Sequence, residues 1–161
     1  MARYKSNHYE DLQPGMTSKM LKHLREVSAL GEGCDLSHDP DGVRERIQKY
    51  FDLCEEADLK PTQSGLSMAI GITRRANHKW RTGELGKNEE TRKILIAAQS
   101  VLECLMEGYM TEGQINPVAG IFVMRNNYGY KNEDVRQDEP APQLEGADIK
   151  ALEEKYRDSV T

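Results

Sequence analysis

The chain has 161 residues, of which 37% are hydrophobic, 30% charged and 6% aromatic, a composition typical of a folded but rather polar protein. The residues after Met1 lack an apolar signal segment, and no run approaches the ~20 apolar residues of a membrane span, so we expect no membrane partner. The cysteines, Cys34, Cys54 and Cys104, are odd in number and far apart, which argues against a disulfide framework. We expect reduced thiols.

The net charge of −5 is unevenly distributed along the chain. Residues 133–161 hold nine acidic and four basic side chains, so this tail alone accounts for the whole net charge. Residues 74–93, in contrast, hold seven Lys or Arg against three Glu. Because distribution matters more than the total, the acidic balance does not exclude a nucleic-acid ligand.

The sequence of residues 1–58 predicts two helices. Residues 1–38 are the hardest to interpret, although Met20, Leu24 and Val27 recur at helical spacing within residues 16–30. Asp39 and Pro40 then form an N-cap and first-turn pair. The apolar residues that follow at helical spacing predict a core helix that ends near residue 58: Val43, Ile47, Tyr50, Phe51 and Cys54.

Residues 62–82 carry the pattern that is most informative about function. Thr62 suits an N-cap, and Gly71 stands where a left-handed residue closes a short helix. Ile72 fills the turn, and Thr73 caps a second short helix. Two short helices that meet through a glycine turn predict a helix-turn-helix, the motif that places its second helix in the major groove of DNA.

The second helix of this pair is polar and basic. Ala76 and Trp80 lie four residues apart and define its inner face, which favours a core role for Trp80 over base stacking. The residues on the remaining faces are the candidate DNA-binding set: Arg74, Arg75, Asn77, His78, Lys79 and Arg81. A basic run is also often a solvated face, so the pattern alone leaves a purely structural helix pair open.

Residues 88–111 predict a long helix with apolar side chains on more than one side, and such a helix needs two partners. We therefore expect it to join copies of the chain through these residues: Ile94, Ala98, Val101, Leu102, Leu105, Met106 and Tyr109. Asn116 and Pro117 then begin a second helix, expected to be compact and buried, that stops at residues 127–129.

The acidic tail begins with a linker that contains Pro140 and Pro142. Beyond the linker, an apolar stripe predicts a short amphipathic helix that docks on a partner: Ile149, Leu152, Tyr156 and Val160. A solubilising end is the alternative. The chain is therefore expected to be all-α, with a segment 1–38, a helical region 39–87, oligomerisation helices 88–132 and a tail 133–161.

Catalytic and metal motifs are missing from the sequence. The stretch GELGKN lacks the first glycine of a phosphate-binding loop, because Arg81 stands there, and Asn88 replaces the Ser or Thr after Lys87. Cys34 and His38 have no further ligands nearby for a zinc site. We expect a protein without enzymatic activity, cofactor or metal.

Four segments appear in an order that resembles a known family: IQKYFDLCEEAD, PTQSGLSMAIGITRRANHKW, TRKILIAAQSVLECLMEGYM and PVAGIFVMRNNYGYKNEDV. From about Val43 to Val135 the chain is similar to the terminase small subunits of tailed bacteriophages, in particular the gp3-like DNA-packaging group. The last segment resembles the family's pattern of a basic residue, one or two Asn, an aromatic residue and Gly, followed by Lys. The tail lacks the strong basic charge found in some members.

The resemblance implies a helical ring in the host bacterial cytoplasm. Such a ring binds double-stranded viral DNA at the packaging-initiation site and recruits the large terminase subunit, which carries the ATPase and nuclease. The basic residues of 74–81 would then face DNA, and residues 94–109 would form the oligomer core. Two alternatives stay open: a helix-turn-helix transcriptional regulator of phage or bacterial origin, and an adaptor that binds only proteins.

Overall fold

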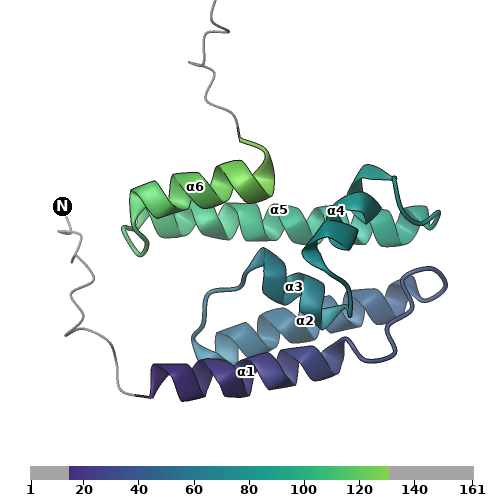
Figure 1. The fold of residues 1–161 in the computed structure, drawn as a ribbon, viewed down its shortest axis with the longest axis horizontal. Coiled ribbons are helices and arrows are strands. Elements are labelled where there is room, and N and C mark those ends of the chain that lie inside the picture. Colours follow the sequence, from purple (N-terminus) through teal and green to yellow (C-terminus); the bar gives the residue numbers. More distant parts are fainter. Residues whose placement is uncertain (1–14, 131–161) are drawn as a thin grey trace, which may run out of the picture. The chain divides into compact units, whose positions relative to one another are not determined.

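Residues 15–130 are the part of the chain that the computed structural model describes, and they contain six α-helices and no strand (Figure 1). This confirms the all-α prediction. The helices are α1 (Met16–Leu30), α2 (Pro40–Ala57), α3 (Gln63–Ala69), α4 (Arg74–Thr82), α5 (Glu89–Thr111) and α6 (Pro117–Tyr128).

Side-chain caps set the starts of α2 to α6, and four of these caps were predicted from the sequence, whereas α1 begins after Gly15 without a side-chain cap. Asp39 accepts a hydrogen bond from the Gly42 amide at 2.9 Å, and Pro40 follows it in the first turn of α2. Asn116 caps α6 in the same way, with Pro117 next. The side chain of Asn88 accepts from the Glu90 and Thr91 amides, so α5 begins one residue later than expected. A cap oxygen satisfies amides that have no acceptor inside the helix.

The core lies where α1, α2, α3 and α5 meet. The side chains of Val27, Val43, Leu66 and Leu95 are fully buried there. Figure 1 shows α5 with α6 along one side and α2 facing the other, and both helices contact α5. Residues 31–38 add Leu36, which is 7% exposed, so the region after α1 contributes to the same core.

The inner face of α1 differs from the expected one. Val27 is buried, but Met20 and Leu24 are exposed, and His23 takes the inner position one turn before Val27. The Nε2 atom of His23 lies 3.7 Å from the Cys54 sulfur of α2. The packing of α1 on α2 and α3, rather than the apolar spacing alone, therefore decides which residues point inward.

The helix predicted after Asn116 is present, but the expectation that it is buried is wrong. Gly120 and Met124 are its buried residues, whereas Val118, Ile121 and Phe122 are exposed. In the described chain α6 packs along α5, so its opposite side stays uncovered. No helix within residues 15–130 is long and apolar enough to cross a membrane. The predicted helix at residues 147–161 lies outside the described residues.

Candidate nucleic-acid interface

The helices α3 and α4 are joined by four residues, 70–73, and the turn is closed by Gly71 with a φ of +72°. The Thr62 and Thr73 hydroxyls accept hydrogen bonds from the Gly65 and Ala76 amides at 3.0 and 3.1 Å. These are the two caps and the turn glycine predicted from the sequence. Ile72 packs against the core, so the turn is fixed by an apolar contact as well.

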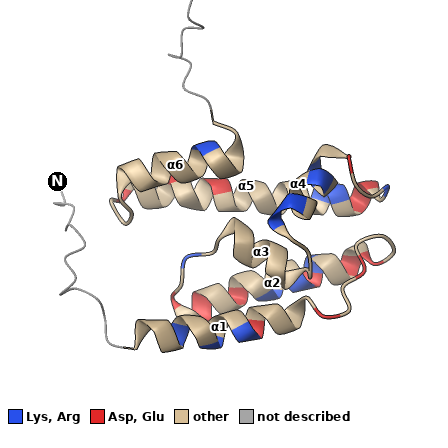
Figure 2. Cartoon of the chain, in the orientation of Figure 1, with Lys and Arg blue, Asp and Glu red and all other residues tan. Residues whose placement is uncertain are grey.

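One side of α4 is buried and the other presents positive charge. Asn77 and Trp80 are buried, with exposed fractions of 0% and 6%. Arg75 and His78 project from the opposite side and are exposed, as is Arg74, while Lys79 is half-buried. The sequence of α4 contains no acidic residue, and Figure 2 shows its basic segments. The helix therefore presents cations without neutralising partners of its own.

The two arginines in the first turn of α4 are unfavourable for the helix itself. The N-terminus of a helix carries partial positive charge, so a cation there costs about 0.3–1 kcal/mol. Arg74 and Arg75 stand at this end, and no acidic residue shares the turn. Free backbone amides at the same end favour an anion such as phosphate. The arrangement suits an anionic ligand better than it suits helix stability.

The structure corrects the assignment of Asn77 to the DNA-facing set. Its side-chain amide donates a hydrogen bond to the Ser67 hydroxyl at 3.0 Å and accepts one from Arg81 Nε at 3.2 Å. Ser67 in turn donates to the Gln63 carbonyl at 2.9 Å. This buried chain of hydrogen bonds joins α4 to α3, because Gln63 and Ser67 belong to α3. Asn77 positions α4 and is enclosed by the protein.

Arg81 is half-buried at the edge of the basic face. Burial lowers the pKa of its guanidinium, while the nearby Tyr128 raises it. Burial in turn raises the pKa of Tyr128, and Arg81 lowers it. Arg81 is therefore held by Asn77 and lies near Tyr128, so its freedom to reach a ligand is smaller than that of Arg75.

The end of α6 supports the start of α4. Arg74 Nη1 donates a hydrogen bond to Asn127 Oδ1 at 2.7 Å, and the Gln99 side chain donates to the Asn127 carbonyl at 3.2 Å. Tyr128 packs against the core. Asn127 and Tyr128, which belong to the segment singled out by the sequence resemblance, therefore fix the C-terminal turn of α6 against its neighbours.

Two backbone contacts behind the turn were not predicted from the sequence. A Cβ at Gly31 would collide with the Met68 carbonyl and come within 2.6 Å of the Gly71 amide. The Tyr50 hydroxyl accepts from the Thr62 amide at 2.7 Å and donates to the Thr62 carbonyl at 3.1 Å. Burial raises the pKa of Tyr50. The end of α1 and the middle of α2 thus fix both ends of α3. In the sequence, Gly31 directly after α1 was the residue that could have indicated the close backbone approach.

The loop after α4 has a structural explanation. Gly86, in the stretch compared above with a phosphate-binding loop, has a φ of +76°, and a Cβ there would collide with the Trp80 ring. The glycine lets the loop close over the indole. Among residues 15–130, no three His, Cys, Asp or Glu side chains are grouped to hold a metal ion.

The expected oligomerisation residues of α5 divide into three groups by their exposure. Ala98 and Leu102 are 5% and 2% exposed and belong to the core of the protomer itself, so they are not available to a neighbouring chain. Val101 is exposed. The others are half-buried: Ile94, Leu105, Met106 and Tyr109. Lys60 Nζ lies 5.1 Å from the centre of the Tyr109 ring.

Comparison with known proteins gives one family. The family model described as DNA-packaging protein gp3 matches residues 33–136, which is more than half of the chain. The matched range contains α2 to α6 and therefore the whole basic face of α4. No curated protein and no solved structure matches the chain significantly.

Proposed function

Because the chain belongs to the gp3 family of DNA-packaging proteins, we propose that it is the small subunit of a phage terminase and that α3 and α4 form a DNA-binding helix-turn-helix. In this proposal α4 meets double-stranded viral DNA at the packaging-initiation site. The chain acts in the host bacterial cytoplasm without catalysing a reaction, and the large subunit supplies the motor and the nuclease.

The observation that carries the proposal is that α4 has one buried, hydrogen-bonded side and one exposed, cationic side. The buried bonds of Asn77 and the burial of Trp80 hold the helix in one orientation. Arg75 and His78 then project away from the protein, with Arg74 and Lys79 beside them. Phosphate contacts supply most non-specific DNA affinity, and contacts to base edges add specificity.

A single copy of this face would bind DNA weakly. Non-specific binding by such a surface has a Kd of roughly 10⁻⁴–10⁻⁶ M at physiological salt. Several copies in a ring raise the apparent affinity by ~10²–10⁴ without new contacts. We therefore propose a homo-oligomeric ring, and residues 147–161 as the segment that docks on the large subunit.

The test is a double substitution on the exposed side of α4, Arg75→Ala with Lys79→Ala, measured by titration of a DNA duplex at several salt concentrations. We expect weaker binding and a slope of log K against log[salt] that is smaller by about 1.8, since each phosphate contact contributes ~0.9. The control is Lys19→Ala with Lys22→Ala, which removes the same charge from exposed positions on α1.

Equal losses from both double variants would mean that net charge, and not the α4 face, governs binding. An unchanged slope for the α4 variant would rule out α4 as the DNA surface, and a wild-type chain that binds no duplex would leave a protein adaptor. The mass of the native assembly separates a ring from the dimer that is usual for a transcriptional regulator.

A further inference from the structure

Apolar residues surround α6, although α5 covers one side of it. Gly120 and Met124 face α5, whereas the residues Val118, Ile121 and Phe122, here called the α6 ridge, are 76%, 52% and 68% exposed. Val118 and Phe122 lie four residues apart, so they share one face of the helix, and Ile121 lies beside them. A helix that is apolar all round is normally buried, and in the described chain this one is half covered.

A groove of matching character runs between α2 and α5. Its volume is about 820 Å³, and its apolar lining includes Ile47 and Phe51 of α2 with Ile94, Ala97 and Val101 of α5. A second hollow of about 550 Å³ shares Val101 and extends along α5 past Leu105 to Tyr109. We call the two together the α2–α5 groove. Arg44, Glu90 and Lys93 are the charged residues of its first part.

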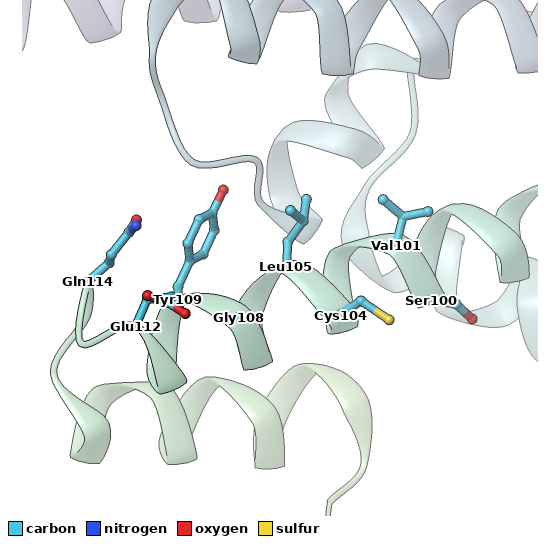
Figure 3. Close-up of a pocket in the computed structure, with 8 residues that line it drawn as sticks. All are labelled: Ser100, Val101, Cys104, Leu105, Gly108, Tyr109, Glu112 and Gln114. Atoms are coloured by element: carbon cyan, nitrogen blue, oxygen red, sulfur yellow. The ribbon is translucent and has the colours of Figure 1, made fainter.

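The ridge and the groove lie on opposite sides of α5. Figure 3 shows Val101, Leu105 and Tyr109 projecting from α5 to the side away from α6. Met110, which an added Cβ at Gly120 would meet, belongs to the other side of α5 and contacts α6. One chain therefore carries a protruding apolar surface and a hollow apolar surface that cannot reach each other.

We propose that the α6 ridge of one copy of this chain occupies the α2–α5 groove of the next copy. The inference rests on the oligomer in the proposed function and gives it an interface. Because the two surfaces differ, each contact leaves a free ridge at one end and a free groove at the other. Such head-to-tail contacts form a ring when the rotation between copies closes, whereas a two-fold dimer would use one surface twice.

The composition of the two surfaces fits this pairing. The three ridge residues carry no charge, and between Lys93 and Glu112 the side chains of α5 that line the groove are uncharged. Burial of the ridge against this uncharged middle part excludes water from apolar atoms without placing a charge against them. Ala98 lines the groove and Leu102 lies in the core of the protomer, so α5 has apolar side chains on the core side as well as along the groove.

Two single substitutions test the pairing, and both are at exposed positions, so the protomer should fold. Val101→Asp places a charge in the groove, and Phe122→Asp places one on the ridge. We expect each variant to lose the wild-type assembly and to sediment as a single chain, with an unchanged far-ultraviolet circular dichroism spectrum. Ala97→Asp is a second groove variant. Leu21→Asp on α1, which is 49% exposed compared with 46% for Val101, is the control and should assemble normally.

Mixing the variants identifies the two surfaces as partners. Val101→Asp keeps its ridge and Phe122→Asp keeps its groove, so an equimolar mixture should form a pair and stop at two chains. Retention of the wild-type mass by either variant, or a mixture that stays monomeric, would overturn the pairing. A monomeric wild type would overturn it together with the proposed ring. The duplex titration of α4 measures DNA binding separately in each case.

Discussion

The helices α4 and α6 are both short and are both held by a small buried side, but they differ in what they leave exposed. Asn77 and Trp80 anchor α4, and Gly120 and Met124 anchor α6. The outer side of α4 is cationic, whereas the outer side of α6 is apolar. A cationic surface is suited to a polyanion, and an apolar one is suited to another protein surface.

The difference shows that the residues on the exposed side of a helix can indicate what the protein binds, because folding does not require them. Neither Arg75 at the start of α4 nor Val118 and Phe122 on α6 makes a contact that stabilises an isolated protomer. Substitutions of the anchoring residues should therefore affect stability first, and substitutions of the exposed sides should affect binding first.

The largest effect is expected from Trp80→Ala. The indole is 6% exposed and lies under Gly86, so its removal leaves a cavity where α4 meets α5. Loss of a buried Trp costs about 3–5 kcal/mol in the free energy of unfolding, measured by urea denaturation. DNA binding should fall with it, because α4 loses its support.

The matched change on the exposed side of the same helix is Arg75→Ala. An exposed position away from a packed contact should change the free energy of unfolding by less than about 0.5 kcal/mol while it weakens DNA binding. Similar losses of stability in the two variants would mean that α4 is not held through its buried side.

Two glycine substitutions compare the backbone contacts that hold the two helices: Gly31, which contacts the turn before α4, and Gly120, which lies in α6. The Cβ in Gly31→Ala collides with the Met68 carbonyl and approaches the Gly71 amide, and backbone atoms cannot move cheaply. We expect a loss near the upper end of the ~1–3 kcal/mol typical of overpacking, with weaker DNA binding as the turn before α4 shifts.

In Gly120→Ala the new Cβ meets the Met110 side chain of α5 instead, with Cγ at 2.7 Å. A flexible thioether can move aside, so this loss should be smaller than the loss in Gly31→Ala. Thermal unfolding of both variants gives the comparison. A greater loss of stability in Gly120→Ala than in Gly31→Ala would mean that the contact between α6 and α5 tolerates an added Cβ less well than the turn before α4.

Among the substitutions at buried positions, the smallest loss of stability is expected from Asn77→Ala. The change removes the bonds to Ser67 and Arg81, but Ser67 still donates to the Gln63 carbonyl. We expect a loss of about 1–2 kcal/mol, within the range for an interrupted buried hydrogen bond, together with a freer Arg81. The control is Asn126→Ala in α6. It removes an exposed hydrogen bond from the Asn126 side-chain amide to the Phe122 carbonyl, so its effect on stability should be nearly neutral. Urea denaturation of both variants measures the two changes in the free energy of unfolding.

The sequence predicted the helices well because their limits depend on nearby residues. Asp39, Thr62, Thr73 and Asn116 cap the helices that follow them, and Gly71 closes α3 in the left-handed conformation. Each of these effects acts within about one turn of helix, so it can be recognised in a short stretch of sequence.

The tertiary structure decided which side of each helix is covered. Asn77 points inward because Ser67 of α3 accepts its hydrogen bond, and His23 replaces Met20 and Leu24 as the inner face of α1 because it meets Cys54 of α2. Leu102 and Val101 are neighbours in the sequence, yet the first lies in the core and the second lines the groove. Apolar spacing shows that a helix has apolar faces, but contacts between residues far apart in the chain determine which of those faces is buried.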